Sequence, residues 1–417
     1  MHHSFRLAAA AGLALLSGCG IGHTLGHQVL GLDDSAAPGT TPSVFGYAVA
    51  DEPQAAIVAR QILNQGGNAA DAAAAEGFAL AVTLPSRAGL GGGGACLIKM
   101  PDTSGTMQPP VALLFPAGSP AKVDNNADRP AAIPTLARGL LALQARYGQL
   151  PPSEIITPAE RLAAGAELSP ALETDLQTVG PALIADPAAA AVFAPQGTLL
   201  PANATLAQPD LAATLETLRT QGVQGFYAGG FAENFVEAAD DAGGGLTTAD
   251  LATAPPQFTA PVTGTTGGYA TASLPTANAG STTMPASAGF ATLDKNGGSV
   301  VCVTSMNNLF GTGRIAAGTG VLLAASPHSN PTPDLAATIA YAPGSNSFRA
   351  ATTGTGKAAA AQAAQTALTN ALSNTQTPIL APGRANSISC PTPIPGGEST
   401  CTATAAPQGQ GLAIGGR

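Results

Sequence analysis

The chain has 417 residues, of which 45% are hydrophobic and only 10% are charged. Its formal net charge is −9 and its basic residues form no cluster, which argues against nucleic acid as a partner. A chain of this length can bury one large hydrophobic core or two moderate ones, so we expect a globular body.

The N-terminal residues 1–19 have the pattern of a secretory signal. A positive charge precedes an apolar run over residues 7–16, which is too short to span a bilayer. The run ends in the letters LSGC, which resemble a bacterial lipobox and predict that Cys19 is lipidated. An ordinary signal peptide with a chance cysteine is the alternative. We therefore expect an exported, periplasmic protein with a lipid anchor to the membrane, the outer membrane in a Gram-negative host, and a tether over residues 20–43.

Beyond the tether, hydrophobic periodicity and turn residues predict both helices and strands. Strands are predicted at residues 47–50, 95–100, 318–325 and 346–353, besides a hairpin at residues 287–305. Helices are predicted at residues 53–64, 70–82, 134–147, 157–166, 209–221, 231–239 and 357–372. Residues 255–285 are rich in Thr, Gly, Pro and Ala and predict only weak strands, and the chain after residue 372 is predicted to be irregular. The elements alternate without the rhythm of a doubly wound sheet, which indicates an α+β fold class.

Residues 89–94, GLGGGG, match the GxGxxG pattern of a dinucleotide-binding loop. Such a loop follows a strand and opens a helix, whereas this one follows a predicted helix and opens a predicted strand. We therefore interpret it as backbone that lines a pocket or as a tight entry into the strand. Because no CxxC motif or Cys/His spacing indicates a metal site either, we expect no cofactor.

The strongest local signal in the chain is the hairpin at residues 287–305. Two β-prone runs flank the letters KNGG, in which Asn296 and Gly297 predict a two-residue turn because both of its positions need positive φ. By this register Ser287 lies opposite Met306.

The predicted register places a hydroxyl among polar neighbours. Ser287, at the start of the first strand, lies beside Ser305 and Asn307 at the end of the second. A Gly-rich turn that includes Gly311 follows, and there the backbone can approach a ligand closely. Ser287 is therefore a candidate nucleophile.

The five histidines offer little support for a Ser-His-Asp triad. Four of them lie in the signal or the tether, and His328, the one reasonable candidate, lies in a loop rich in Pro and Ser. If the protein is a hydrolase, we expect its base to be another group. An N-terminal nucleophile meets this requirement, because its own α-amine has a near-neutral pKa and takes the hydroxyl proton once the preceding peptide bond is cut.

Lipidation of Cys19 would leave four of the five cysteines. Cys390 and Cys401 lie in a region rich in Pro and Gly and could close a short loop in an oxidising compartment. Cys96 and Cys302 lie in apolar, strand-like runs, so we expect them to be buried thiols.

Four long segments, in the same order, resemble the γ-glutamyltransferase family. They are residues 66–100 (GGNAADAAAAEGFALAVTLPSRAGLGGGGACLIKM), 133–151, 211–251 and 294–313. The resemblance implies the αββα four-layer sandwich of an N-terminal-nucleophile (Ntn) hydrolase that cuts itself into two subunits. Residues 44–286 would form a large-subunit-like part and residues 287–417 a small-subunit-like part of one composite domain.

The resemblance also implies roles for single residues. The family's nucleophilic Thr falls on Ser287, Ser305 takes the place of a hydroxyl that assists the nucleophile's amine, and Asn307 that of a substrate-contacting Asn. We expect Gly311 to line the same site. The Thr pair at residues 282–283 is a rival nucleophile, out of register.

Other positions depart from the family pattern. The paired glycines of the family's oxyanion hole fall on Gly354 and Thr355, so one backbone donor could survive there. Pro116 replaces the Arg that grips the γ-glutamyl carboxylate, and residues 324–329 contain no acidic group to hold the glutamyl amine. Gly354 could instead be a simple turn residue, and Ser287 an ordinary serine before a strand.

Two hypotheses follow from the sequence. The first is a γ-glutamyltransferase-like, self-processing amidohydrolase or acyltransferase that attacks γ-glutamyl, glutathione-like or related small-molecule or peptide amides and passes the acyl group to water or an amine. The second is a non-catalytic lipoprotein that keeps the fold as a binding or structural module. Self-cleavage before Ser287 would separate the two.

Overall fold

The computed structural model describes residues 45–122, 127–275 and 287–416, which belong to one compact unit spanning residues 42–417. The predicted signal, the tether, Cys19 and the Thr pair at residues 282–283 lie outside the described residues, so what was inferred for them stays a prediction. Within the described ranges, no helix is both long and apolar enough to cross a membrane.

The first sheet has seven strands, each antiparallel to its neighbours, in the order β17-β1-β9-β10-β2-β3-β6. They are β1 (Gly46–Ala50), β2 (Gly93–Lys99), β3 (Val111–Phe115), β6 (Gln257–Thr259), β9 (Ser287–Asp294), β10 (Ser299–Ser305) and β17 (Leu412–Gly416). Strands from both predicted subunit-like parts therefore pair within one sheet. The three central strands β9, β10 and β2 are buried along their whole length.

The second sheet has six strands in the order β16-β15-β14-β13-β8-β7. They are β7 (Val262–Thr266), β8 (Tyr269–Ser273), β13 (Ala336–Tyr341), β14 (Phe348–Thr355), β15 (Arg384–Ser389) and β16 (Thr402–Thr404). β15, β16 and β17 lie in the stretch after residue 372, so the prediction that this stretch is irregular is wrong. Side chains from the facing sides of the two sheets form a shared hydrophobic core, which includes Val49, Val301, Ile339 and Ile388.

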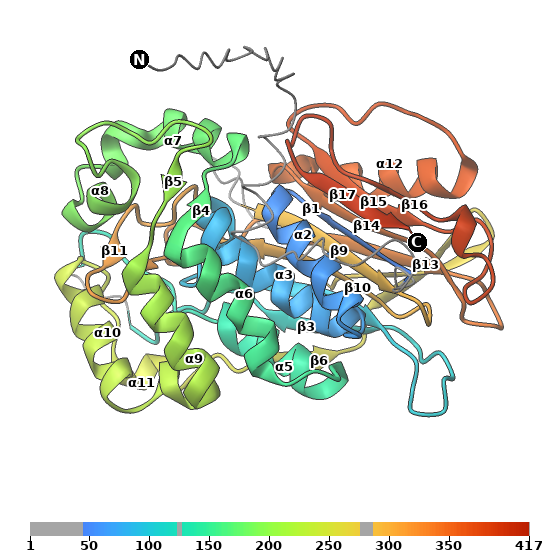
Figure 1. Cartoon of the computed structure of the whole chain (residues 1–417), viewed down its shortest axis with the longest axis horizontal. Helices are drawn as coiled ribbons and strands as arrows, with labels where there is room; N and C mark the ends of the chain where they lie inside the picture. The colour runs from blue at the N-terminus through green and yellow to red at the C-terminus, as the bar shows by residue number, and fades with distance from the viewer. Residues whose placement is uncertain (1–44, 123–126, 276–286, 417) are drawn as a thin grey trace, which may run out of the picture. The chain divides into compact units, whose positions relative to one another are not determined.

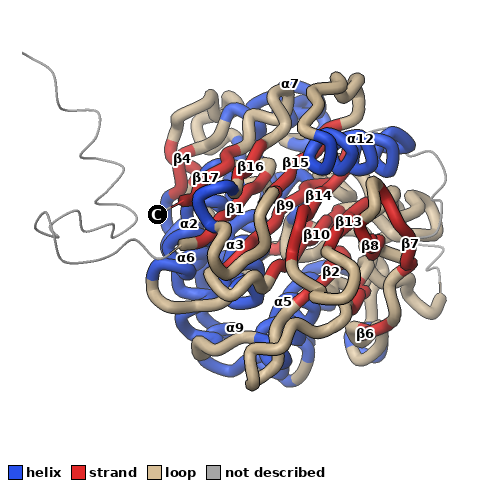
Figure 2. The backbone as a smooth tube through the Cα atoms, turned by 90° about the vertical axis from the view of Figure 1, so that its right-hand side faces the viewer, coloured by secondary structure: helices blue, strands red, loops and turns tan. Residues whose placement is uncertain are grey.

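Helices cover the outer face of each sheet (Figures 1 and 2). α2 (Pro53–Asn64), α3 (Ala69–Thr83) and α5 (Leu136–Tyr147) lie against the first sheet, and α12 (Ala360–Ser373) lies against β13, β14 and β15 of the second. The Ala-rich α3 is buried on every side, because its small side chains allow close approach to the sheet. The predicted α+β class and αββα four-layer sandwich are confirmed.

The remaining elements are short or lie beside the sheets. Helices are α4 (Pro85–Ala88), α6 (Pro152–Gly165), α7 (Pro170–Leu183), α8 (Pro187–Phe193), α9 (Pro209–Tyr227), α10 (Gly229–Asp241) and α11 (Thr248–Leu251), with 3₁₀ turns at Lys357–Ala359 and Glu398–Thr400. Short strands are β4 (Ala166–Glu167), β5 (Thr205–Leu206), β11 (Ile315–Ala316) and β12 (Val321–Leu322). The strand predicted over residues 318–325 is thus reduced to β12.

The predicted hairpin is present, but its register differs by one residue from the prediction. Ser287 lies opposite Ser305, not opposite Met306. The two serines therefore face the same side of the sheet, which brings the two hydroxyl-bearing side chains closer than the predicted register would.

The shift arises in the loop, which has three residues rather than two. The Asp294 carboxylate accepts hydrogen bonds from the amides of Asn296 and Gly298, and the Asp294 amide donates to the Gly298 carbonyl (N···O 2.9 Å). Gly297 has φ +80°, whereas Asn296 does not have positive φ. The loop is a type I turn followed by a glycine bulge. An Asn-Gly sequence is compatible with this three-residue loop as well as with the two-residue turn.

The expectation that Cys96 and Cys302 are buried thiols is wrong. They occupy paired positions of β2 and β10, with Cα atoms 4.1 Å apart, and form a disulfide. Cys390 and Cys401 form a second disulfide, which closes the short loop suggested by the sequence. The first pairing depends on strand register, which an apolar run does not reveal.

Candidate active site

Ser287 is the first residue of β9, a central strand of the first sheet, and its neighbours in the ladder are small. It lies opposite Ser305 of β10, and Ser305 lies opposite Gly93 of β2. Both serines are almost fully buried, with exposed fractions of 1% and 2%. Gly93 has no room for a side chain, since a Cβ there would come 2.3 Å from Thr135 Oγ1. The hydroxyls therefore lie at one end of three adjacent buried strands.

The backbone amide of Ser287 points away from β10. Two residues further along β9, Gly289 pairs with Asp51, and the Asp51 amide donates to the Gly289 carbonyl (3.1 Å). Because hydrogen-bonded and non-hydrogen-bonded pairs alternate in an antiparallel ladder, Ser287 and Ser305 form a non-hydrogen-bonded pair, in which Cα atoms lie about 4.5 Å apart and side chains are closest. The Ser287 nitrogen is thus not needed for the pairing with β10.

Ser305 and Asn307 are connected to each other. The Ser305 hydroxyl oxygen accepts a hydrogen bond from the backbone N–H of Asn307 (2.8 Å). Asn307 is fully buried and has φ +61°, and its Nδ2 atom donates to the Ala325 carbonyl (2.8 Å). Its Oδ1 atom is buried and has no hydrogen-bond partner. This acceptor is available to an N–H group of a ligand.

Gly311 belongs to the tight turn that follows Asn307. It has φ +57°, and a Cβ there would come 2.1 Å from the Leu323 carbonyl oxygen. Both observations require glycine, and close packing within the protein explains them without a ligand. A substrate contact at Gly311 stays a prediction.

Gly354 and Thr355 lie at the end of β14, so Gly354 is a strand residue and not a turn. Gly354 stands between Ala336 of β13 and Ala385 of β15, and a Cβ there would come 2.0 Å from the Ala360 carbonyl oxygen of α12. Amides of a central strand normally bond within the sheet. A role of these two residues in an oxyanion hole stays a prediction.

The facing sheets place the end of β14 near the start of β9. Gly289 of β9 lies against Thr353 of β14, where a Cβ would come 2.4 Å from Thr353 Oγ1, and Asn386 of β15 donates to the Gly289 carbonyl (2.9 Å). At the other end of the hairpin, Gly297 lies near Ile394, which follows β15. β15 therefore begins at the end of the sandwich where β9 begins.

Four charged residues that the sequence interpretation missed surround this end. Arg384 is the first residue of β15, and Arg87 lies on α4, which contacts β9 and β10. Arg87 forms an ion pair with Asp175 of α7 (2.6 Å). The fourth residue, Asp51, directly follows β1. Burial lowers the pKa of Arg384, nearby Arg87 lowers it further, and Asp51 and Asp175 oppose the shift. A charged residue two positions before the glycine loop at residues 89–94 was the available signal for Arg87.

Two further positions that the sequence singled out are exposed, and Pro116 lies between Phe115 and Ala117, which pack against Gly93, the ladder partner of Ser305. Pro116, which replaces the family's Arg, is exposed, and so is His328, whose Nε2 lies 3.3 Å from the Pro120 carbonyl oxygen. The described residues hold no group of three or more His, Cys, Asp or Glu side chains that could bind a metal ion.

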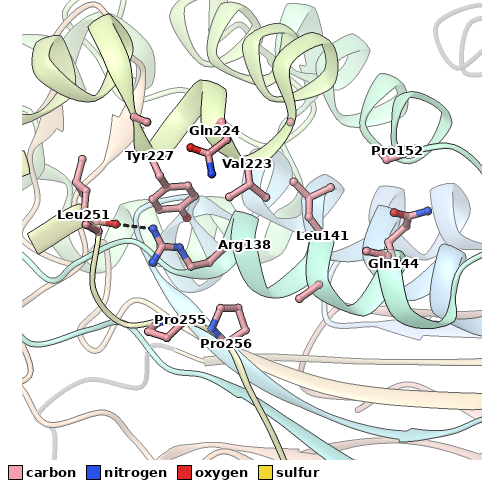
Figure 3. Close-up of a pocket in the computed structure, with 15 residues that line it drawn as sticks. Arg138, Leu141, Gln144, Pro152, Val223, Gln224, Tyr227, Leu251, Pro255 and Pro256 are labelled. Atoms are coloured by element: carbon pink, nitrogen blue, oxygen red, sulfur yellow. Dashed lines mark hydrogen bonds between the residues drawn. The ribbon is translucent and has the colours of Figure 1, made fainter.

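A pocket of about 690 Å³ lies elsewhere, among helices (Figure 3). The Arg138 guanidinium lies over the Tyr227 ring at 3.7 Å from its centroid and donates to the carbonyls of Leu251 (2.6 Å) and Thr253. Burial raises the pKa of Tyr227 to about 12. Because none of the predicted site residues line this pocket, we do not assign the chemistry to it.

Known proteins resemble this chain in sequence. The model of the family described as gamma-glutamyltranspeptidase matches residues 55–287. The glutathione hydrolase proenzyme of Escherichia coli (strain K12) is 33% identical over 254 residues, which are 56% of this chain and 43% of that protein. The acylase ACY 1 proenzyme of Pseudomonas sp. (strain SE83) is 31% identical over 242 residues, which are 54% of this chain and 43% of that protein. Each match spans less than half of the relative's own length.

One solved structure shares nearly the whole architecture. The crystal structure of cephalosporin acylase from Bacillus halodurans superposes with a TM-score of 0.73 over 92% of this chain and 99% of that chain, at 17% sequence identity. At that identity the likeness shows a common fold and nothing more.

Proposed function

From the premise that this chain belongs to the γ-glutamyltranspeptidase family, we propose that it is a self-processing amidohydrolase or acyltransferase with Ser287 as its nucleophile. The observation that carries the proposal is the position of Ser287. It begins a buried central strand, lies directly opposite Ser305 in the ladder, and has a backbone nitrogen directed away from β10. After cleavage of the preceding peptide bond, that nitrogen would be a free α-amine beside the hydroxyl.

The chemistry would proceed in two steps. The Ser287 hydroxyl oxygen attacks the carbonyl carbon of an amide, and the α-amine of Ser287 takes its proton. The amide C–N bond then breaks, the leaving amine takes that proton, and an ester remains on Ser287. Water or a second amine attacks this ester and releases the acid or a new amide. Ser305 would orient the α-amine, and Asn307 Oδ1 would accept from an N–H group of the substrate.

Family membership supports γ-glutamyl, glutathione-like or related amides as the substrate class. Pro116 in place of the family's carboxylate-gripping Arg weakens the case for γ-glutamyl groups themselves.

We further propose that the protein is exported and lipid-anchored through Cys19, with the signal over residues 1–19 as the basis. Radiolabelled palmitate incorporation that is lost in Cys19→Ala would test the anchor.

The experiment that tests self-processing is a reducing denaturing gel with N-terminal sequencing of the purified protein. Wild type should split, with the smaller fragment beginning at Ser287, and Ser287→Ala should stay whole. Ser345→Ala, which alters an exposed serine, is the matched control and should split like wild type. A single intact wild-type chain would overturn the proposal and favour the non-catalytic binding or structural module.

A further inference from the structure

A buried cation forms one wall of the pocket among the helices (Figure 3). Arg138 of α5 is only 8% exposed, and its outer nitrogen atoms donate to the carbonyls of Leu251 and Thr253. Its Nε atom is buried without a hydrogen-bond partner, and Arg138 forms no ion pair within the described residues. The carbonyl dipoles stabilise the guanidinium but leave its charge unpaired, which is unusual for a buried arginine.

Tyr227 of α9 brings a second unpaired group to the same wall. Its ring lies against the Arg138 guanidinium, and the residue is buried. The Tyr227 hydroxyl lies close to Arg138 but meets no partner at hydrogen-bonding geometry. Because burial raises the pKa of Tyr227 to about 12, the hydroxyl keeps its proton at neutral pH and can act as a donor. Buried polar groups are normally hydrogen-bonded, so two donors on adjoining side chains lack an acceptor here.

No acidic side chain supplies that acceptor. Among the described residues that line the pocket there is no Asp or Glu, and Arg138 is the one charged residue. Asp250 of α11 directly precedes one of the carbonyls that Arg138 contacts. The Asp250 Oδ1 atom accepts from the Ala121 backbone N–H (3.0 Å), and its Oδ2 atom accepts from the backbone N–H (3.0 Å) and the hydroxyl (2.6 Å) of Thr247. The pocket wall therefore carries one positive charge and no negative charge, which favours an anionic ligand.

The rest of the wall is mostly apolar and leaves room for a ligand. Leu141, Val223, Pro255 and Pro256 surround the hollow, whose volume is about 690 Å³ (Figure 3). Gly222 lines it at an interruption of α9, with φ +66° and ψ −157°, and no atom lies within 4 Å of the place that a Cβ would take. Pockets of this size and composition commonly hold drug-sized molecules.

We propose that this pocket binds a small organic monoanion with an apolar body, of the class of arylalkyl carboxylates. The carboxylate accepts from Arg138 Nε and from the Tyr227 hydroxyl, and the apolar body fills the hollow beside Leu141. Hydrogen bonds from a cation to a carboxylate are among the strongest in proteins, and exclusion of water strengthens them. Neither Ser287 nor Ser305 lines the pocket, so the inference goes beyond the proposed function and does not depend on it.

Calorimetric titration with 4-phenylbutyrate and with the neutral 4-phenylbutyramide tests the charge of the ligand. We expect wild type to bind the carboxylate about 10-fold or more tighter than the amide. Arg138→Met should abolish this preference, whereas Arg146→Met should keep it, because Arg146 is an exposed arginine of α5 that does not line the pocket. Tyr227→Phe should weaken binding of the carboxylate about 3-fold or more. This variant removes one oxygen atom that has no partner, so it decides the question even if Arg138→Met does not fold.

An introduced tryptophan reports where the probe binds, because the chain contains no Trp. Ala145→Trp places an indole at an exposed position of α5 that lines the pocket, and Ser345→Trp places one at an exposed position that does not. Addition of 4-phenylbutyrate should change the emission of the first variant, with the half-saturation that calorimetry gives for that variant, and should leave the emission of the second unchanged. Equal affinities for the two probes, no binding of either probe up to about 10 mM, or an unchanged emission of Ala145→Trp would overturn the site.

Discussion

Ser287 and Ser305 lie directly opposite each other in the non-hydrogen-bonded register of β9 and β10. In such a pair the side chains are at their closest, so the Ser305 hydroxyl is the nearest side-chain polar group across the strand from Ser287. The backbone N–H of Asn307 donates to one lone pair of the Ser305 hydroxyl oxygen and fixes the position of that oxygen. The hydroxyl proton and the second lone pair stay available to Ser287.

The first prediction concerns Ser305→Ala. Loss of the hydroxyl should slow self-cleavage before Ser287 about 10- to 100-fold, because the group that orients the nucleophile is removed. Ser299→Ala is a close control, since Ser299 is a buried serine on β10 whose hydroxyl has no partner, at the opposite end of the strand. Cleavage is followed on reducing gels over time. Equal rates for the two variants would show that Ser305 has no role in processing.

The second prediction follows from the disulfide between β2 and β10. Cleavage before Ser287 leaves Cys96 in the larger fragment and Cys302 in the smaller one, so the disulfide would join the two fragments covalently. Cleaved wild type should therefore migrate as one band without reductant and as two bands with it. The double variant Cys96→Ala/Cys302→Ala should give two bands under both conditions.

Cys390→Ala/Cys401→Ala is the control for the gel, because that disulfide lies wholly within the smaller fragment. This variant should migrate like wild type in both lanes. Two bands from cleaved wild type in the absence of reductant would contradict a Cys96–Cys302 bond in the mature protein.

Local signals allowed much of the fold to be predicted. The bounds of α2 match the prediction at residues 53–64, because Pro53 at its first turn and the glycines after Gln65 act within a few residues. The hairpin and its two strands were predicted for the same reason. The register was wrong by one residue because the Asp294 side chain selects the loop, and the letters Asn-Gly are compatible with both loops.

The remaining features depend on contacts between distant parts of the chain. β15 was predicted as irregular because the letters RANSIS at residues 384–389 have little hydrophobicity, and its burial comes from β14 and α12. Pairing of Cys96 with Cys302 needed the register of β2 against β10. Arg87 and Arg384 lie far apart in sequence, so their shared position at the start of β9 appears only in the folded chain.

The third prediction concerns Glu76, a fully buried carboxyl group of α3 whose two oxygens have no hydrogen-bond partner. Burial raises the pKa of Glu76 well above 4.5. Above pH 4.5 the unfolded chain therefore binds fewer protons than the folded one, and stability falls as pH rises until the folded pKa is reached. Relative to that of Glu76→Gln, the free energy of unfolding of wild type should fall by about 1.4 kcal/mol per pH unit within that window.

Urea unfolding of wild type and Glu76→Gln between pH 4 and pH 8 measures this difference in the free energy of unfolding. Glu154→Gln, at an exposed position of α6, is the control and should follow the wild-type curve. A constant difference between wild type and Glu76→Gln across the whole range would show that Glu76 does not titrate differently in the two states.

The fourth prediction concerns Lys99, which is fully buried at the end of β2. Its Nζ atom donates to the Gln108 carbonyl (2.9 Å) and lies 4.6 Å from the centroid of the Tyr341 ring. Burial lowers the pKa of Lys99 from 10.5 to about 8. Between these values the unfolded chain binds more protons than the folded one, so stability contributed by this position rises with pH. Unfolding free energies of wild type and Lys99→Met should therefore move apart by about 1–3 kcal/mol between pH 8 and pH 10.5, in favour of wild type. The control is Lys295→Met, which alters an exposed lysine beside the hairpin turn and should show no such divergence from wild type. If the unfolding free energies of Lys99→Met and wild type instead ran parallel across this pH range, the Lys99 ammonium would be as well solvated in the folded protein as in the unfolded chain.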